Sequence, residues 1–297
     1  MTPPRRAATR GSTLARWQTE RVLARLDGPA ELVVVTTTGD RRADEPIHTL
    51  GGQGVFVKEV QEAVLRGRAD LAVHSAKDLP SATPPGLVLA CVPERADPRD
   101  ALVGTAFDEL PTGARVATGS VRRRAQLAHA RPDLTFAELR GNVPTRVARA
   151  AEHDAAVVAL AALERLDLVD DHVHPLEPSV LLPQVAQGAL AVECRADDDA
   201  TIAALRAIED WTARRAVDAE RAFLAALGGG CDRPVAALAA VDDERIRITG
   251  LIASLDGRVM LRTETAGEDP VATGQAVAAL LLDRDGGRAL LADDPAA

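Results

Sequence analysis

The sequence predicts an α/β protein with more than one domain. Short apolar segments suited to strands alternate with longer segments of helical periodicity, which is the pattern of a sheet covered by helices. The chain has 297 residues, 46% of them hydrophobic, and this length suggests two or three domains with a substantial buried core. After residue 234 the pattern changes to consecutive strands and one helix, which predicts a small α+β domain.

Five apolar runs predict strands in the first part of the chain. They are ELVVVTT (31–37), ADLAVHS (69–75), GLVLACV (86–92), ARVATGS (114–120) and DAAVVAL (154–160). Helical spacing of apolar residues is found in VFVKEVQEAVLRG (55–67), SVRRRAQLAHARP (120–132) and NVPTRVARAAEH (142–153), the last with Asn142 as a candidate cap. We therefore expect a parallel sheet with helices on its faces.

Two joints rich in proline or charge divide the chain, at VPERADPRD (92–100) and around LLPQVAQG (181–188). Two such joints are typical of one domain inserted into another. We expect domain 1 to comprise residues 1–92 and 184–208, domain 2 residues 93–183, and domain 3 residues 209–297. Domain 3 would hold a long helix at about 210–227, two or three strands with Asp-rich or Asp-Gly turns, and a helix near 271–282.

Charge and cysteine content argue against several classes of protein. The formal charge is -9, with 44 acidic and 35 basic residues, so we expect no general attraction to nucleic acid or to an anionic membrane surface. No segment has the pattern of a signal peptide or the length of a membrane span, which predicts a cytoplasmic protein. The three cysteines, Cys91, Cys194 and Cys231, lack paired metal-ligand spacing, and we expect neither a disulfide framework nor a metal site.

The stretch GGGCDRP (228–234) places Cys231 behind three glycines and ahead of a proline, after a helical run. One explanation is a helix end, because glycine commonly terminates a helix and proline prevents its continuation. The other is that a turn without side-chain bulk presents the sulfur to a large partner, or allows a group to be attached to it. These residues alone leave both explanations open.

Candidate binding residues follow predicted strands, where ligands bind in open α/β sheets. HSAKDLP (74–80) places Lys77 and Asp78 after a strand, although a solvated lysine beside a turn-capping aspartate would give the same pattern. TGSVRRRAQL (118–127) puts arginines in the first turn of a helix, where the macrodipole disfavours cations, so an anionic partner explains them better than a solvated face. The candidate anion-binding residues here are Thr118, Ser120, Arg122 and Arg123.

Further arginines lie in other strand-to-helix segments, Arg10 in ATRGSTLARWQ (8–18) and both Arg140 and Arg146 in LRGNVPTR (139–146). If two lobes face each other, these side chains suit a substrate that carries many carboxylates. Nucleotide binding is not expected, because neither GxGxxG nor GxxxxGK[ST] occurs. Lys58 and Lys77 are the only lysines.

Nine motifs in order resemble the porphobilinogen deaminase family (hydroxymethylbilane synthases). They are ATRGSTLARWQ, TTTGD, GGQGVFVKE, HSAKDLP, ERADPRDALV, TGSVRRRAQL, LRGNVPTR, AQGALAVECR and ERAFLAALGGGCDRP. The resemblance implies two lobes like those of periplasmic binding proteins with a cleft between them, and a small C-terminal α+β domain. It implies a transferase of tetrapyrrole (haem and porphyrin) biosynthesis, EC 2.5.1.61. Such an enzyme joins four porphobilinogen molecules to a primer with loss of ammonia, and hydrolysis then releases hydroxymethylbilane.

The resemblance also implies roles for single residues. Cys231 would carry the dipyrromethane cofactor through a thioether, and Asp78 would be the catalytic aspartate. The other implied cofactor-binding residues, besides Asp78 itself, are Lys77, Thr118, Ser120, Arg122, Arg123 and Arg146. The implied substrate-binding residues are Arg10, Ser12, Phe56, Arg140 and Arg146, and a monomer without nucleic-acid or membrane partners is expected.

Some positions depart from the family pattern. Gln53 stands where relatives often have lysine, Ala117 and Gly119 alter the GTSS-like turn, and Ala186 replaces a glycine at the lobe joint. Two alternatives are a two-lobed anion-binding or sensor protein without chemistry, and an enzyme of the same fold acting on another polycarboxylate. Cys231 discriminates against both, because neither needs a covalent primer.

Overall fold

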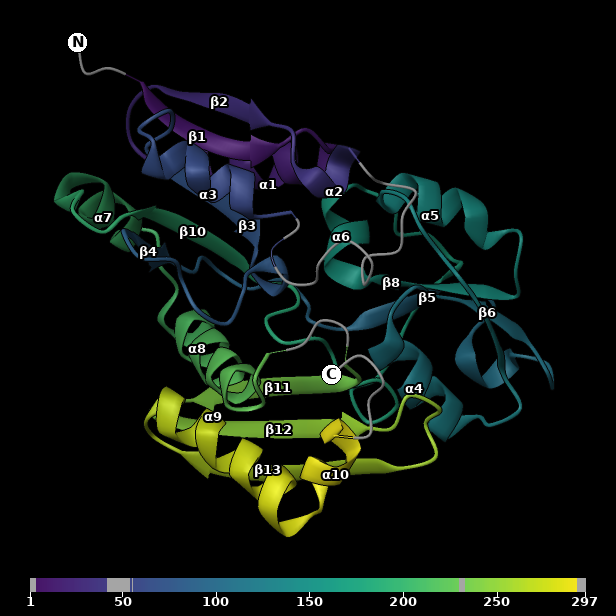
Figure 1. Cartoon of the computed structure of the whole chain (residues 1–297). Coiled ribbons are helices and arrows are strands. Elements are labelled where there is room, and N and C mark those ends of the chain that lie inside the picture. The colour runs from purple at the N-terminus through teal and green to yellow at the C-terminus, as the bar shows by residue number, and fades with distance from the viewer. Residues whose placement is uncertain (1–3, 42–53, 55, 230–232, 293–297) are drawn as a thin grey trace. The chain divides into compact units, whose positions relative to one another are not determined.

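The structure is a computed structural model that describes residues 4–41, 54, 56–229 and 233–292. The chain forms two compact units, Met1–Ala96 with Gly188–Arg214, and Asp97–Gln187 with Arg215–Ala297. The described strands form two five-stranded sheets and one three-stranded sheet (Figure 1), which confirms the predicted α/β class with two sheet-bearing lobes and a smaller α+β part. The division into three domains and a cleft between lobes stay predictions.

The first unit is built on a five-stranded sheet of order β2-β1-β3-β10-β4. Its strands are β1 (Arg5–Arg10), β2 (Ala30–Val35), β3 (Leu71–Ser75), β4 (Leu87–Cys91) and β10 (Leu190–Arg195). Its helices are α1 (Thr13–Leu23), α2 (Thr38–Arg41), α3 (Lys58–Leu65) and α7 (Asp199–Arg206), with a 3-10 turn at Ala76–Asp78. α8 (Trp211–Ala226) begins in this unit and ends in the second.

Side chains of β3 alternate between two cores, as expected for a strand buried on both faces. Leu71 and Val73 pack in a cluster with Val22 of α1, whereas Ala72 packs in a second cluster with Val60 of α3. The sheet thus lies between helices. It is mixed rather than parallel, because β10 returns from the other part of the chain and runs antiparallel to β3 and to β4. The expectation of a parallel sheet was wrong at this strand.

The second unit contains a five-stranded sheet of order β7-β6-β8-β5-β9. Its strands are β5 (Asp100–Gly104), β6 (Arg115–Ala117), β7 (Thr135–Ala137), β8 (Ala155–Ala159) and β9 (Val173–Pro175). α4 (Val121–Ala130), α5 (Val143–Ala150), α6 (Leu160–Arg165) and a 3-10 turn at Phe107–Glu109 connect them. β6 runs parallel to β7 and β8, and β5 runs antiparallel to β8 and β9, so this sheet is also mixed.

The second unit also holds an antiparallel sheet of β11 (Val235–Asp242), β12 (Arg245–Ala253) and β13 (Met260–Gly267). It is followed by α9 (Pro270–Ala279), a π-helical turn at Leu280–Arg284 and α10 (Gly287–Ala292), drawn in yellow in Figure 1. Gly274 of α9 lies so close to α8 that a Cβ would be 2.1 Å from the Ala219 carbonyl oxygen. No described helix is long and apolar enough to cross a membrane.

Candidate active site

The end of β3 carries Lys77 and Asp78 on the 3-10 turn Ala76–Asp78. The turn is fixed at its start, because the Ala76 amide donates to the Ala189 carbonyl at 3.0 Å and the Ser75 hydroxyl is hydrogen bonded to the Gln18 side chain. Leu79 is buried directly after it. Lys77 and Asp78 themselves are half-buried. A buried strand thus leads directly into a turn that carries Lys77 and Asp78 at its carboxyl end.

Behind this turn, a buried polar group connects β3 to β10 and α3. The Gln61 amide donates to Glu193 Oε2 at 2.8 Å, and His74 Nε2 lies 3.2 Å from the same oxygen. All three residues are at most 5% exposed. The Gln61 hydrogen bond ties α3 to β10, whereas His74 Nε2 and Glu193 Oε1 are buried without a hydrogen-bond partner among the described residues. Sequence reasoning did not identify Gln61 or Glu193.

Arg10 at the end of β1 is held by Asp40 and Phe56. Its Nε and Nη2 contact Asp40 Oδ1 at 3.2 and 2.6 Å, and the guanidinium carbon lies 4.0 Å from the centre of the Phe56 ring. The ring lies on Gly39, where a Cβ would be 2.1 Å from it. Burial alone would raise the pKa of Asp40, but hydrogen bonds from Arg10 and Thr37 together with the Arg10 charge hold that pKa below its usual value.

Ser12 and Lys58, two further residues singled out from the sequence, lie at the starts of helices in the first unit. Ser12 caps α1, and its Oγ accepts a hydrogen bond from the Ala15 amide at 3.3 Å. Lys58 is exposed at the start of α3. The structure therefore places Arg10 in contact with Phe56, and Lys77 and Asp78 on one 3-10 turn.

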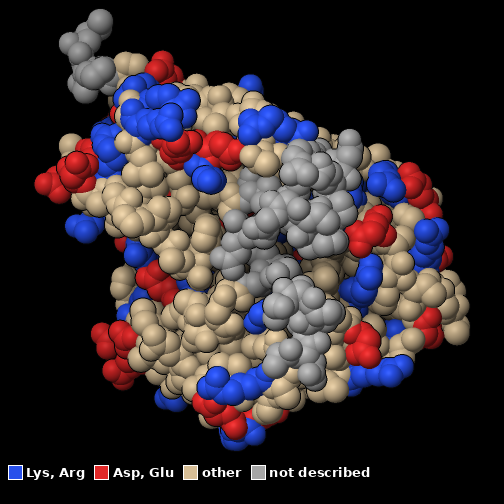
Figure 2. All heavy atoms as spheres, viewed as in Figure 1, with Lys and Arg blue, Asp and Glu red and all other residues tan. Residues whose placement is uncertain are grey.

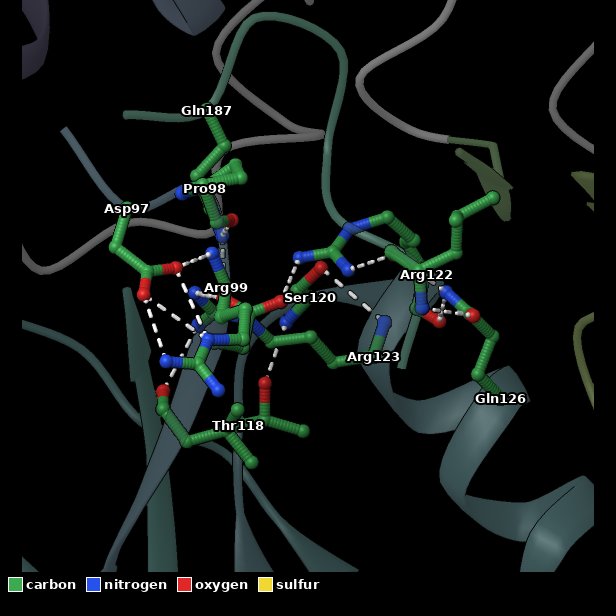
Figure 3. A network of polar contacts seen from close by, with 12 residues as sticks. Asp97, Pro98, Arg99, Thr118, Ser120, Arg122, Arg123, Gln126 and Gln187 are labelled. Carbon is green, nitrogen blue, oxygen red and sulfur yellow. Dashed lines mark hydrogen bonds and ion pairs between the residues drawn. The ribbon is translucent and has the colours of Figure 1, made fainter. Parts of the chain in front are cut away.

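In the second unit, the turn after β6 carries Thr118 and Ser120 (Figure 3). The Ser120 amide donates to Thr118 Oγ1 at 3.2 Å, and Ser120 Oγ accepts from the Arg123 amide at 3.4 Å as the cap of α4. Thr118 is buried. A Cβ on Gly119 would be 3.0 Å from the Leu139 carbonyl oxygen, so the larger side chain of the family pattern has little room at this turn.

Arg122 and Arg123 of α4 point into the protein and share the carboxylate of Asp100, the first residue of β5. Arg122 Nη2 lies 2.7 Å from Asp100 Oδ2, and Arg123 Nε and Nη2 lie 3.1 and 2.6 Å from Oδ1. Burial lowers the pKa of Arg122 below its ordinary value; the Asp100 charge opposes this shift and the Arg123 charge adds to it. The anion expected near these arginines therefore includes a carboxylate of the protein itself.

These buried arginines differ from the charges on the surface. Figure 2 shows basic and acidic side chains interspersed over the face in view. Several surface charges form exposed ion pairs, such as Arg66–Glu62. The side chains of Arg122 and Arg123 are only 4% and 7% exposed, and that of Asp100 is fully buried. Exposed pairs contribute little net free energy, whereas a buried pair depends on every partner being present.

Arg140 and Arg146 lie near the turn that precedes α5. Arg140 Nη2 is 3.6 Å from Glu138 Oε2, and Arg146 Nε donates to the Gly141 carbonyl at 2.8 Å. The predicted cap is confirmed, since Asn142 Oδ1 accepts from the Thr145 amide at 3.0 Å. Both arginine side chains are half-buried.

The cysteines divide into two groups. Cys91 and Cys194 are free thiols buried in the core of the first unit, and burial raises the pKa of Cys91 to about 12 and that of Cys194 to about 11. Cys231 and Gln53 lie outside the described residues. Within the described part of the chain, no group of three or more His, Cys, Asp or Glu side chains is placed to hold a metal ion.

Sequence reasoning missed Asp40 and Asp100, the carboxylates that hold Arg10 and the arginine pair, and also the buried Gln187 and Glu193. One sequence feature could have identified Asp100. It directly precedes the apolar run ALV in ERADPRDALV, and a charged residue next to a buried strand needs a partner. Chemically, the first unit offers a carboxylate for proton transfer or for stabilising positive charge, and the second offers guanidinium groups for binding carboxylates.

Comparison with known proteins gives a consistent result. The family model "Porphobilinogen deaminase, dipyromethane cofactor binding domain" matches residues 6–203, and "Porphobilinogen deaminase, C-terminal domain" matches residues 214–283. A porphobilinogen deaminase of Roseiflexus sp. (strain RS-1) is 49% identical over 96% of this chain and 97% of its own. One of Syntrophotalea carbinolica is 46% identical over 97% and 96%, and one of Brevibacillus brevis is 43% identical over 96% of each. The chain therefore belongs to the porphobilinogen deaminase family.

Proposed function

We propose that this chain joins four porphobilinogen molecules to a dipyrromethane primer held by a thioether to Cys231, and then releases hydroxymethylbilane by hydrolysis. The observation that carries the proposal is the pair of buried arginines that share one carboxylate. An acidic protein has no general reason to bury two guanidinium groups together, but a ligand that carries an acetate and a propionate on each pyrrole gives one.

The described residues fit such a group. Arg122 Nε is buried and has no hydrogen-bond partner among the described residues, so the arginine pair retains a donor for a further acceptor. Thr118 and Ser120 lie in the turn that leads into the same helix. We assign Arg122, Arg123, Thr118, Ser120, Arg146 and Lys77 to binding carboxylates of the dipyrromethane, and Asp78 to binding its pyrrole N–H groups. When bound, this group would supply the free pyrrole carbon to which the first substrate is joined.

Asp78 is the proposed catalytic residue. Loss of ammonia from the aminomethyl group of porphobilinogen leaves positive charge on the substrate, and a carboxylate close to the pyrrole N–H stabilises that charge as it develops. The half-buried position of Asp78, on a turn fixed by backbone hydrogen bonds, supports this role, because a fixed carboxylate needs little reorganisation during the reaction. Lys77 adds a positive charge next to it for a substrate carboxylate.

The substrate-binding residues are proposed to be Arg10, Ser12, Phe56, Arg140 and Arg146. Arg10 already binds one carboxylate, that of Asp40, through Nε and Nη2, and guanidinium groups bind acetate and propionate in the same way. The Phe56 ring, which lies against Arg10, offers an apolar face to a pyrrole ring. Cytoplasmic location, a monomeric state and classification as a transferase, EC 2.5.1.61, belong to the same proposal.

Intact-mass measurement of the full chain tests the primer. We expect an added mass of two pyrrole units that maps to the Cys231 peptide, and we expect the Cys231→Ser variant to lack it. A chain whose mass stays unmodified after incubation with porphobilinogen or preformed hydroxymethylbilane would contradict the proposal and favour a binding protein without chemistry.

The catalytic role of Asp78 is tested separately by following hydroxymethylbilane production. We expect Asp78→Ala to abolish turnover while the protein still acquires its primer. Asp108→Ala is the matched control, because Asp108 is an exposed aspartate that also lies in a three-residue 3-10 turn, and it should retain normal production. Near-normal production by Asp78→Ala would remove Asp78 from the mechanism.

A further inference from the structure

Asp100 is the common partner of the two buried arginines of α4. One carboxylate oxygen, Oδ1, accepts from Arg123 Nε and Nη2 and from Gln187 Nε2 at 3.1, 2.6 and 2.9 Å, while Oδ2 accepts from Arg122 Nη2 at 2.7 Å. Each arginine thus uses a different oxygen. A single carboxylate therefore fixes the distance and the relative orientation of both guanidinium groups.

The remaining contacts hold each arginine from the other side. Arg122 Nη1 donates to the Leu182 carbonyl at 2.7 Å, and Arg123 Nη1 donates to the Val157 carbonyl at 2.8 Å. Gln126 in turn accepts from the Leu182 amide at 2.8 Å, so the carbonyl that receives Arg122 is itself held (Figure 3). Neither side chain is free to rotate without breaking buried hydrogen bonds.

The charges in this group are not balanced. Two guanidinium groups carry two positive charges, and all of their ion pairs within the described residues go to Asp100. Buried charge is costly unless it is paired, and the partnerless Arg122 Nε adds an unsatisfied donor. The arrangement suits a site in which Asp100 provides one carboxylate and a ligand provides another.

We infer that Asp100 is a positioning residue for primer capture, which holds Arg122 and Arg123 in one orientation so that a second carboxylate, from the dipyrromethane, meets donors that are already aligned. The inference rests on the proposed function. Asp100 does not need to touch the reacting atoms, and its effect is on acquisition of the primer through the two arginines.

The test compares primer acquisition in full-length Asp100→Asn and wild-type chains produced without porphobilinogen. Each is incubated with preformed hydroxymethylbilane, whose hydroxymethyl carbon forms the thioether to Cys231 with loss of water, and the gain of its four pyrrole units, two of which are the primer, is followed by intact mass. We expect acquisition by Asp100→Asn to be slower by on the order of 10- to 100-fold, the range for misplaced binding groups. Asp97→Asn is the matched control, since Asp97 precedes the same strand but pairs with Arg99, and it should acquire the primer at the wild-type rate.

A second readout does not depend on the primer. In the primer-free chains, phenylglyoxal should modify Arg122 and Arg123 faster in Asp100→Asn than in the wild type, measured by peptide mass after Asp-N digestion at a temperature where circular dichroism shows both proteins folded. A role in stability alone would lower the melting temperature without slowing primer acquisition by the folded protein.

Asp100→Glu replaces Asp100→Asn in the test if the Asn variant does not fold. It retains the charge but displaces the carboxylate, so we expect a folded protein with slowed acquisition. Wild-type rates in the folded Asn variant, or in the Glu variant if the Asn variant does not fold, would overturn the inference. Failure of the wild-type chain to gain any primer would instead overturn the proposed function itself, and the inference with it.

Discussion

The two five-stranded sheets have the same plan but different buried partners. Each has three parallel strands, then an antiparallel strand, β10 in the first unit and β5 in the second, and then an edge strand. Each antiparallel strand carries a buried carboxylate, Glu193 or Asp100. Glu193 meets Gln61 and His74, whereas Asp100 meets two arginines and Gln187. Two sheets of the same plan thus surround their buried carboxylates differently. Glu193 has one amide and one histidine beside it, whereas Asp100 faces two guanidinium groups.

A second similarity lies in the turns after β1 and β6, each of which is the middle one of three parallel strands. β1 leads through Gly11 and Ser12 into α1, and β6 leads through Gly119 and Ser120 into α4. Both serines cap their helix. The turns share local chemistry, so the units differ in the long side chains that follow each turn and in the residues that these side chains meet.

The largest expected effect comes from neutralising the two buried carboxylates. Asp100→Asn leaves two buried guanidinium groups without a counter-charge, and we expect the free energy of unfolding to fall by about 3–5 kcal/mol. Glu193→Gln keeps the size of the side chain and much of its hydrogen bonding, and we expect a loss of about 1–2 kcal/mol. Urea unfolding measures both losses. Equal losses would show that the counter-charge of Asp100 matters no more for stability than the carboxylate of Glu193.

The next effect concerns support for α4 that comes from the β12–β13 turn. Gly257 has a φ of 73°, and a Cβ there would be 2.3 Å from the Ala125 carbonyl oxygen; the Gly257 carbonyl also contacts His129 Nδ1 at 2.9 Å. We expect Gly257→Ala to destabilise the protein by about 2–4 kcal/mol from backbone strain and overpacking.

Gly113→Ala is the matched control for Gly257→Ala. Its φ is 77°, and nothing lies within 4 Å of the added Cβ, so only the backbone strain of about 1–2 kcal/mol applies. If thermal unfolding gives the same loss for both variants, the contact with α4 does not matter for stability.

Removing the two serine caps tests whether the turns after β1 and β6 contribute equally to stability. Ser12→Ala and Ser120→Ala each remove one side-chain acceptor for a free helix amide, and we expect each to cost about 1 kcal/mol in urea unfolding. Ser179→Ala, at an exposed serine that caps no described helix, should leave stability unchanged. A much larger loss for Ser120→Ala would mean that the cap also fixes the buried arginines.

The smallest effect is a gain at Ala186. This residue has a φ of 59°, which is strained for alanine, and its amide donates to the buried Glu220 Oε2 at 2.6 Å. Ala186→Gly restores the residue of the family pattern, and we expect about 0.5–1 kcal/mol of added stability after the entropy of glycine is subtracted. Ala207→Gly is the control, because Ala207 ends α7 in a right-handed conformation without strain, and we expect this variant to be less stable. Calorimetry measures both variants, and a loss of stability in Ala186→Gly as well would contradict the strain argument.

The elements that the sequence predicted well have local causes. Buried strands such as β3 and β8 are continuous apolar runs, and the cap of α5 follows from Asn142 and the residues after it. β1 was missed because its buried part consists of two alanines and a threonine between arginines, which gives little hydrophobic pattern. The short strands β7 and β9 have only three residues each, too few for periodicity to be read.

By itself, the sequence determined the α/β class, the cap of α5, the order of the family motifs and the presence of arginines in the first turn of α4. Only the tertiary structure decided where those arginines point. Asp100 lies 22 residues from Arg122 along the chain, and the antiparallel direction of β5 and β10 depends on a chain that leaves one unit and returns. Caps and apolar periods involve neighbours in the sequence, whereas the partner of a buried charge is set by how distant strands are paired.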